Sequence, residues 1–332
     1  MLELMNLAND DFSTRMFLQE RQQTLPQLLQ QFHLDGVELI FCQPRDEALL
    51  PADCIQGVHL RFWPSWMDLW REDRVALAYE FGDEDGIKRH YGTLTSAGWL
   101  QLWRQNIRQA AACGANYVVC HAANARPSEV CSRHFAFTDE EVIRNLAEVV
   151  NLVMADLPED CWLLFENLWW PGLNFCRPEM ADLLLSLVSH QQSGFMLDSG
   201  HLMNTNLELS DESTAVDYIL QRLNGLGVLR HKIRGMHLHR SLSGSFTRQI
   251  MQSHPVNTPV HDWSEAMDYI NRVDQHAPFQ TDAVRRLISF VEPAYLVHEF
   301  MQTSFAAWKQ QMDIQRHALG QQEGFIGGGN VR

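Results

Sequence analysis

Short apolar runs alternate with longer helical patterns along this chain. Eight of the runs are of strand length and rich in leucine, β-branched and aromatic residues. They occupy residues 2–7, 36–42, 54–63, 115–124, 161–168, 194–200, 232–240 and 294–300. Strands that alternate with helices imply parallel pairing, because parallel strands require a crossover connection.

The segments between these runs carry helix signals. Apolar residues from Leu25 to Phe32 recur on one helical face. Thr138 precedes Glu141 by three residues, which is a capping-box pattern. Pro178 stands where a first helical residue is expected.

Eight βα units in 332 residues predict a (β/α)8 TIM barrel with some enlarged loops. We expect one catalytic domain over residues 1–320 and a flexible glycine-rich tail over residues 321–332. A doubly wound open sheet is the structural alternative. The barrel is favoured because no GxGxxG motif follows the first strand and because polar strand ends are spread over the whole chain.

Charge and cysteine usage narrow the class of protein. The net charge of −15, with 26 basic against 41 acidic residues and no basic run, argues against nucleic acid as the main partner. The seven cysteines form no CxxC motif, which favours buried free thiols in a reducing cytosol. No secretory signal and no apolar run of about 18 residues is present, so a cytoplasmic protein without a membrane span is expected.

Six successive predicted strands bring carboxylates or imidazoles to their carboxyl ends, where TIM barrels place catalytic groups. These residues are His59, His121, Glu166, Asp198, His237 with His239, and Glu299. Each alone has a plain reading, such as a loop carboxylate, a helix cap or a core histidine. Together they provide the oxygen and nitrogen donors that a divalent metal needs, with Mn or Zn favoured over Ca and with Mg, Co and Fe open.

Alternation along a strand restricts which of these side chains can face inward. His237 and His239 share a face, so both can point into the barrel. His298 and Glu299 are adjacent, so only one can. We expect Glu299 to face inward and His298 to pack against a helix.

The motifs "FEN", "DSGH", "MHLHR" and "VHEF", in this order, resemble the xylose isomerase-like TIM-barrel superfamily, which includes sugar isomerases, epimerases and apurinic endonucleases. The resemblance covers nearly the whole chain. It implies four ligands of one shared metal: Glu166, Asp198, His237 and Glu299. It also implies that His201 contacts substrate or a further metal, and that His59 and His121 could hold a second metal with Glu166.

Two departures from the pattern affect the interpretation. Arg240 stands where the family usually has an aspartate after the strand-seven histidine. The endonucleases also carry a D-x-H motif in the following loop, and the nearest counterpart here is His254, with Gln252 in place of the aspartate. With that aspartate missing, a complete three-metal site is not expected.

The leading hypothesis is a metal-dependent isomerase or epimerase of a small polyhydroxy carbonyl compound, working through an enediolate. Glu166 and Glu299 would exchange the proton as base and acid, and His201 and Arg240 would stabilise oxygen charge. The alternatives are a di-metal phosphoesterase or endonuclease-like hydrolase and a non-catalytic sugar- or metal-binding barrel. A homodimer is a possible assembly, since such barrels often pair.

Tryptophans gather in two segments that follow predicted strands. Trp63, Trp66 and Trp70 lie after the third, and Trp169 and Trp170 after the fifth. They predict either an aromatic lid over the substrate or a satellite hydrophobic cluster beneath long loops.

Overall fold

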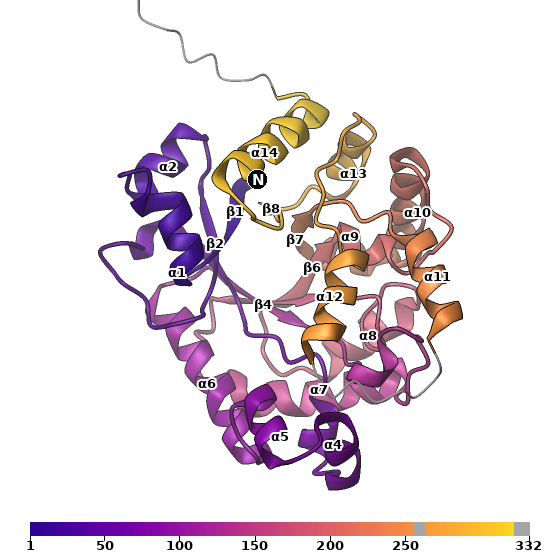
Figure 1. The fold of residues 1–332 in the computed structure, drawn as a ribbon. Helices are drawn as coiled ribbons and strands as arrows, with labels where there is room; N and C mark the ends of the chain where they lie inside the picture. Colours follow the sequence, from indigo (N-terminus) through magenta and orange to yellow (C-terminus); the bar gives the residue numbers. More distant parts are fainter. Residues whose placement is uncertain (255–262, 322–332) are drawn as a thin grey trace, which may run out of the picture.

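Eight parallel strands close into one barrel in sequence order, as predicted (Figure 1). The computed structural model describes residues 1–254 and 263–321. The strands are β1 Leu2–Ala8, β2 Gly36–Ile40, β3 Ile55–His59, β4 Tyr117–His121, β5 Trp162–Glu166, β6 Ser193–Asp198, β7 Ile233–Leu238 and β8 Tyr295–His298. The predicted tail lies outside the described residues, apart from residue 321.

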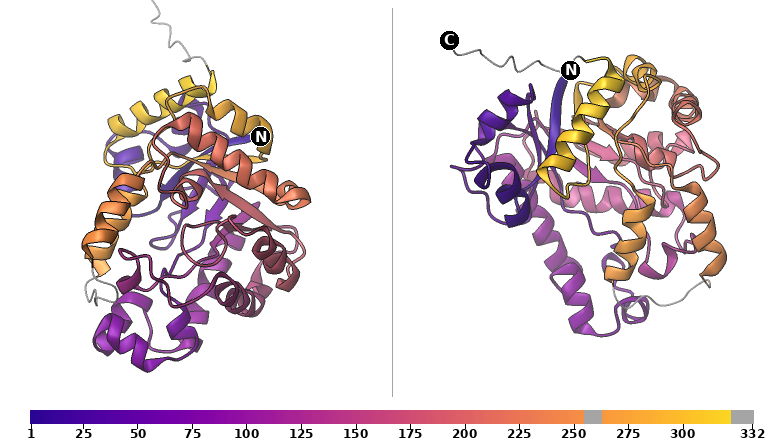
Figure 2. Two further views of the ribbon diagram at one scale, coloured as in Figure 1. Left: turned by 90° about the vertical axis from the view of Figure 1, so that its right-hand side faces the viewer. Right: turned by 45° about the horizontal axis from the view of Figure 1, so that its top comes forward.

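Helices surround the barrel and connect successive strands (Figure 2). They are α1 Asp11–Thr14, α2 Leu25–Gln31, α3 Met67–Trp70, α4 Arg74–Phe81, α5 Glu84–Tyr91, α6 Ser96–Ala112, α7 Asp139–Val153, α8 Pro178–Leu187, α9 Ser199–Met203, α10 Glu212–Gly225, α11 Gly244–Ser253, α12 Trp263–Val273, α13 Val284–Val291 and α14 Phe305–Leu319. The predicted capping box begins α7, where the Thr138 hydroxyl accepts from the Glu141 backbone N–H. Pro178 is the first residue of α8.

The barrel interior is filled by apolar side chains that lie one step below the polar ones. This inner layer consists of Leu4, Tyr117, Val119, Leu164, Met196 and Val297. Because side chains alternate between the two faces of a strand, the residue two positions further along points the same way. Since Val119 and Leu164 face the interior, His121 and Glu166 face it as well.

Strand register then brings the polar residues together at one mouth. His121 pairs with Glu166 across β4 and β5, and Asp198 pairs with His237 across β6 and β7. A larger apolar cluster between strands and helices holds this frame.

The cysteines and the helix lengths bear on the class of protein that the sequence predicts. None of the seven cysteines forms a disulfide, and Cys120 and Cys161 are buried, but Cys42 is exposed. Among the described residues, no helix is both long and apolar enough to cross a membrane.

Candidate metal centre

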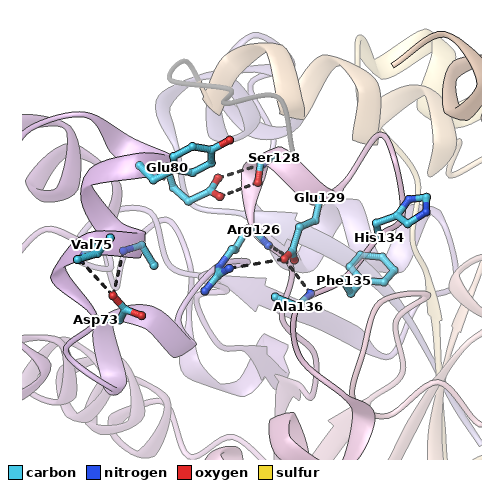
Figure 3. A pocket seen from close by; sticks show the side chains of 11 residues that line it. Asp73, Val75, Glu80, Arg126, Ser128, Glu129, His134, Phe135 and Ala136 are labelled. Atoms are coloured by element: carbon cyan, nitrogen blue, oxygen red, sulfur yellow. Dashed lines mark hydrogen bonds and ion pairs between the residues drawn. The ribbon is translucent and has the colours of Figure 1, made fainter. Parts of the chain in front are cut away.

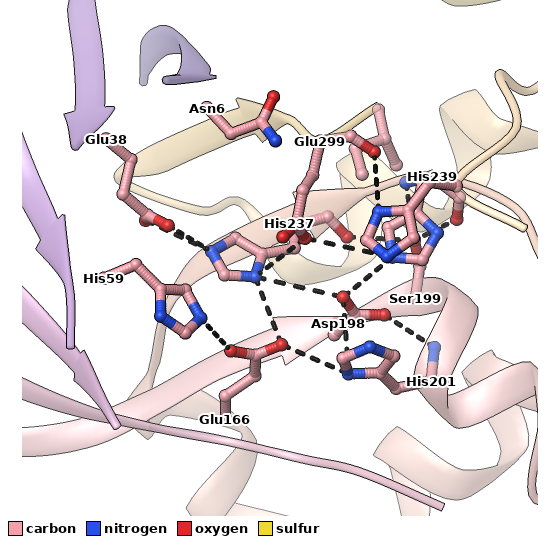
Figure 4. Close-up of polar contacts among 12 residues, drawn as sticks. Asn6, Glu38, His59, Glu166, Asp198, Ser199, His201, His237, His239 and Glu299 are labelled. Carbon is pink, nitrogen blue, oxygen red and sulfur yellow. Dashed lines mark hydrogen bonds and ion pairs between the residues drawn. The ribbon is translucent and has the colours of Figure 1, made fainter. Parts of the chain in front are cut away.

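Glu166, at the end of β5, is fully buried and turns its two oxygens toward different histidines (Figure 4). Its Oε2 lies 3.0 Å from His59 Nε2 and 3.3 Å from His121 Nε2. Its Oε1 lies 3.1 Å from His201 Nδ1 and 3.3 Å from His237 Nδ1. We call His59, His121 and Glu166 the first group; its donor atoms lie within 4.8 Å of one another.

A second group shares Glu166 and adds donors from three further strand ends. It consists of Glu166, Asp198, His237 and Glu299, whose donor atoms also lie within 4.8 Å of one another. His237 Nδ1 is 3.1 Å from Glu299 Oε2 and 3.9 Å from Asp198 Oδ2. The structure thus brings together the four residues that the resemblance implied as ligands, and Glu299 faces inward as expected.

Three facing atoms of the second group are buried without hydrogen-bond partners. They are Glu166 Oε1, His237 Nδ1 and Glu299 Oε2, and the two oxygens lie 3.3 and 3.1 Å from the nitrogen. Unpaired buried polar atoms are costly, and ionised carboxylates placed together repel one another. A divalent cation between them removes both costs, so the residues present fit a bound metal.

Glu38, on β2, fixes the orientation of His237. Its Oε1 lies 3.0 Å from His237 Nε2, and its Oε2 accepts a hydrogen bond of 2.9 Å from the Tyr117 hydroxyl. Figure 4 shows His237 between Glu38 on one side and Glu166 on the other. Glu38 accepts a hydrogen bond from the Nε2–H of His237, so the Nδ1 lone pair is directed at the second group. A carboxylate in this position is the usual support for a metal-binding histidine.

Backbone carbonyls likewise fix the ring orientation of His59 and His201. His59 Nδ1 lies 2.9 Å from the Leu60 carbonyl, which leaves Nε2 directed at Glu166. His201 Nδ1 lies 3.0 Å from the Asn167 carbonyl, which leaves Nε2 directed away from the second group. Fixed tautomers of this kind are expected where the remaining nitrogen binds a metal.

A third group forms where the sequence pattern predicted none. Asp274 Oδ2 lies 3.0 Å from His201 Nε2 and 2.7 Å from His276 Nε2. His276 Nδ1 in turn lies 3.2 Å from the Glu299 carbonyl, which leaves Nε2 directed at Asp274. We call His201, Asp274 and His276 the third group; their donor atoms lie within 4.8 Å of one another.

The prediction that the D-x-H counterpart lies at His254 is therefore wrong. His254 is an exposed residue at the end of α11. The Asp-x-His sequence that does reach the mouth is Asp274–Gln275–His276, in the loop that follows α12. The connection from β7 holds two helices before this loop, so the motif lies about twenty residues further along than expected.

The grouped residues shift one another's pKa values. Burial raises the pKa of Glu166, but the imidazoles of His121 and His237 outweigh it and hold this pKa well below its usual range. Burial lowers the pKa of His276, but Asp274 raises it overall to about 9. The Glu166 carboxylate is therefore ionised at neutral pH, which is the form that binds a cation.

Arg240 does not join the described donor groups, contrary to the expectation that it stabilises oxygen charge in the site. Its guanidinium donates to the Pro278 carbonyl and lies 3.3 Å from Glu212 Oε1. Glu212 is at the start of α10 and also accepts the backbone N–H of Gln280. Arg240 thus ties the loop before α13 to α10.

Gly200 is placed where a larger residue would not fit. It lies inside α9, which Asp198 caps by accepting the His201 backbone N–H at 2.6 Å. A Cβ atom at Gly200 would lie 2.1 Å from His239 Cε1. The glycine therefore provides room for His239, rather than a sharp turn for His201.

Trp63, Trp66, Trp169 and Trp170 are buried and Trp70 is partly buried, and all five pack in hydrophobic clusters. Trp63 and Trp66 pack against Trp99 of α6, with ring centroids 5.8 Å apart in each case. Trp169 and Trp170 belong to a separate cluster beneath the α12 side of the mouth. The satellite-cluster alternative describes them, although Trp169 also packs edge-on against His201 at 5.1 Å.

A separate concavity lies beside α4 and has a volume of about 840 Å³ (Figure 3). Its carboxylates have hydrogen-bond partners within the protein. Glu80 accepts from the Ser128 hydroxyl at 2.6 Å, and Glu129 accepts from the backbone N–H of Ala136 at 2.9 Å. These carboxylates already have hydrogen-bond partners, unlike Glu166 Oε1 and Glu299 Oε2 at the barrel mouth.

Four residues of the mouth were absent from the predicted site, and their signals differ. His239 shares the inward face of its strand with His237, so the sequence indicates its direction but not its role. Glu38 is a carboxylate within an apolar strand, which is a usable signal. Asp274 and His276 lie in a loop, where no strand period indicates the direction of a side chain.

Comparisons with known proteins agree with this fold. The model of a family described as xylose isomerase-like TIM barrel matches residues 31–293. Endonuclease IV from Thermus thermophilus has a similar structure, with 15% identity, 97% of this chain and 100% of that chain covered, and a TM-score of 0.52. A D-tagatose 3-epimerase-like protein has 12% identity, 96% and 97% coverage, and a TM-score of 0.48.

A structure of D-psicose 3-epimerase with D-fructose shares 10% identity, 96% and 97% coverage, and a TM-score of 0.49. At such identities the likeness to solved structures concerns the fold alone. No curated protein matches the sequence.

Proposed function

Because the chain belongs to the xylose isomerase-like TIM barrel family, we propose that its three adjoining donor groups hold divalent cations and hydrolyse a phosphate ester. This proposal places the hydrolase, which was an alternative on sequence grounds, ahead of the isomerase. The mixture of carboxylate and imidazole donors suits zinc or manganese.

The observation that carries the proposal is the division of Glu166 between two groups. Its Oε2 faces the histidines of the first group and its Oε1 faces His237 of the second. A carboxylate shared in this way can hold two cations at the short separation that two-metal phosphoester hydrolysis requires. An isomerase of the predicted kind needs the second group alone and gives no role to the third.

Bound cations would polarise a phosphate oxygen and lower the pKa of a water molecule. The chain supplies the geometry. Glu38 and the carbonyls of Leu60 and Asn167 keep the imidazoles turned toward the groups. His121 and Glu299 have the most exposed side chains of the first two groups, at 11% each, so substrate and water approach past them.

Charge favours a small or locally bound phosphodiester over a long polyanion. The net charge is −15, and two arginines that follow β4 are already engaged. Arg126 forms a bidentate ion pair with Asp68, at 2.8 and 2.7 Å. Arg133 donates to the carbonyls of Asn204 and Trp169. The phosphate charge would therefore be met by the cations.

One observation favours the isomerase as a second candidate. The second group alone offers four protein donors, and Glu166 and Glu299 approach it from the ends of β5 and β8, on different sides of His237. That arrangement can bind one cation and exchange a proton on a bound polyhydroxy carbonyl compound.

Counting cations separates the two candidates. The purified protein is to be loaded with zinc or manganese, desalted, and analysed by inductively coupled plasma mass spectrometry. Two or three ions per chain support the hydrolase, and one ion supports the isomerase.

Activity is measured on the same samples. Bis(p-nitrophenyl) phosphate and a duplex oligonucleotide with an abasic-site analogue serve as phosphodiester probes, and solvent-deuterium exchange into ketoses reports isomerase chemistry. Metal-dependent phosphodiester cleavage is expected. Exchange into a ketose by a single-ion protein, with no cleavage, would overturn the proposal in favour of the isomerase.

A further inference from the structure

In His239, as in His121, Nδ1 has no hydrogen-bond partner and Nε2 is turned toward a carboxylate of the donor groups. The His239 side chain is fully buried. Its Nε2 lies 2.8 Å from Asp198 Oδ2, whereas its Nδ1 is buried without a partner. In His59, His201 and His237 one N–H is held by a carbonyl or by Glu38, and the other ring nitrogen faces a donor group. In His239 the paired Nε2–H points toward a member of the second group.

The ring of His239 also contacts the third group. It stacks on His276 with centroids 4.0 Å apart and planes inclined by 10°. Parallel imidazoles direct their in-plane lone pairs side by side rather than to one point. His239 is therefore not a shared ligand with His276 in this arrangement, even though its donor atom lies within 4.8 Å of those of the third group.

The surrounding chain is built around this ring. Gly200 leaves room for it, because a Cβ there would lie 2.4 Å from His239 Nδ1. The backbone N–H of His239 donates to the Ser199 hydroxyl at 3.2 Å, and this hydroxyl donates to the carbonyls of His237 and His239. The start of α9 thus holds the ring between the second and third groups.

We propose that His239 is a positioning residue that couples the second and third groups: its N–H holds the Asp198 carboxylate and its ring face holds the His276 imidazole. The inference rests on the proposed binding of cations by both groups. Asp198 is also held by the His201 backbone N–H through Oδ1. With both oxygens engaged, Asp198 presents its remaining lone pairs in a fixed direction to the second group.

Two substitutions separate the two contacts. His239→Phe keeps an aromatic face for His276 and removes the N–H to Asp198. His239→Gln keeps an N–H donor for Asp198 and removes the ring. Loss of a group that orients a metal ligand typically lowers metal affinity about 10–100-fold. We expect that loss at the second group for the phenylalanine variant and at the third group for the glutamine variant.

Zinc affinities are to be measured by competition with a chromophoric chelator, together with the midpoint of thermal unfolding. A parallel series in the His276→Ala background, which removes the third group, assigns the affinity of the second. His33→Gln, a change at an exposed histidine, is the control for general loss of imidazole. Unchanged affinities at both groups in folded variants would overturn the proposal, because a merely space-filling residue would alter only stability.

A measurement on the wild-type protein covers the case in which a variant does not fold. Histidine-selective ¹⁵N NMR of the zinc-loaded chain is expected to show His239 protonated at Nε2. A metal-bound Nε2 would make His239 a ligand and overturn the positioning role. Neither readout depends on turnover, so a failure to hydrolyse phosphodiesters would overturn the proposed function and leave this inference standing.

Discussion

Two adjacent residues of the eighth strand region lead to opposite kinds of polar cluster. His298 faces outward to a network that we call the seam network, formed by Glu3, His298, Gln315 and Arg316. Glu299 faces inward to the second group. In the seam network, Glu3 Oε1 lies 2.9 Å from His298 Nε2 and accepts from Arg316 at 2.7 Å, and Gln315 donates to His298 Nδ1 at 2.8 Å.

The difference lies in saturation, because both clusters use carboxylates and imidazoles. Every imidazole nitrogen of His298 has a partner, and the network ties β8 and β1 to α14. At the mouth, His237 Nδ1 and Glu299 Oε2 are buried without hydrogen bonds. A saturated set leaves no polar atom without a partner, whereas the unsaturated set at the mouth leaves buried donor atoms that a bound cation would satisfy.

The largest expected effect on turnover and metal binding comes from a substitution at Glu166. Glu166→Gln removes the charge that the first and second groups share. We expect turnover to fall by on the order of 10³-fold, equivalent to about 4 kcal/mol, and the number of bound ions to fall, with the fold retained. Steady-state kinetics, metal analysis and circular dichroism measure these effects.

Glu80→Gln is the matched control, since Glu80 is a buried carboxylate whose partner is Ser128. It should keep both turnover and ions. Undiminished turnover in Glu166→Gln would remove the shared carboxylate from the mechanism.

The seam network is tested by Glu3→Gln, which is expected to affect stability rather than chemistry. Burial raises the pKa of Glu3, but His298 and Arg316 lower it overall from 4.5 to about 2. A lowered pKa in the folded state stabilises the protein above pH 4.5, and this contribution is lost as the pH falls from about 4.5 to about 2. We expect a loss of about 2–3 kcal/mol at pH 7 and a much smaller loss near pH 2.5.

Urea unfolding at both pH values measures the difference between wild type and variant. Glu47→Gln, in which an 82% exposed side chain is changed, should alter stability by less than about 0.5 kcal/mol. A Glu3→Gln effect that does not depend on pH would show that its hydrogen bonds matter without its charge.

The smallest expected effect is that of Arg240, which lies outside the donor groups of the mouth. Arg240→Gln removes a partner of Glu212 and of the Pro278 carbonyl, both outside the donor groups. Stability should fall by about 1 kcal/mol, with turnover changed less than about threefold. A hundredfold loss of turnover at unchanged stability would return Arg240 to the candidate catalytic residues.

Side-chain direction was predictable from the sequence where strand alternation decides it. The parallel strands follow from their alternation with helices, and the opposite directions of His298 and Glu299 follow from a period of two residues along the strand. Loops obey no such period. The positions of Asp274 and His276 depend on the length and path of the β7–β8 connection, and the outward pairing of Arg240 depends on α10, which is distant in sequence.

The contact between Glu38 and His237 joins residues 199 positions apart across the barrel. The donors themselves come from β3 to the end of β8, so no short fragment of the chain assembles a complete site. The second group would consequently be complete only when the last strand has closed the barrel, because Glu299 follows β8, whereas the first group comes from β3 to β5 alone.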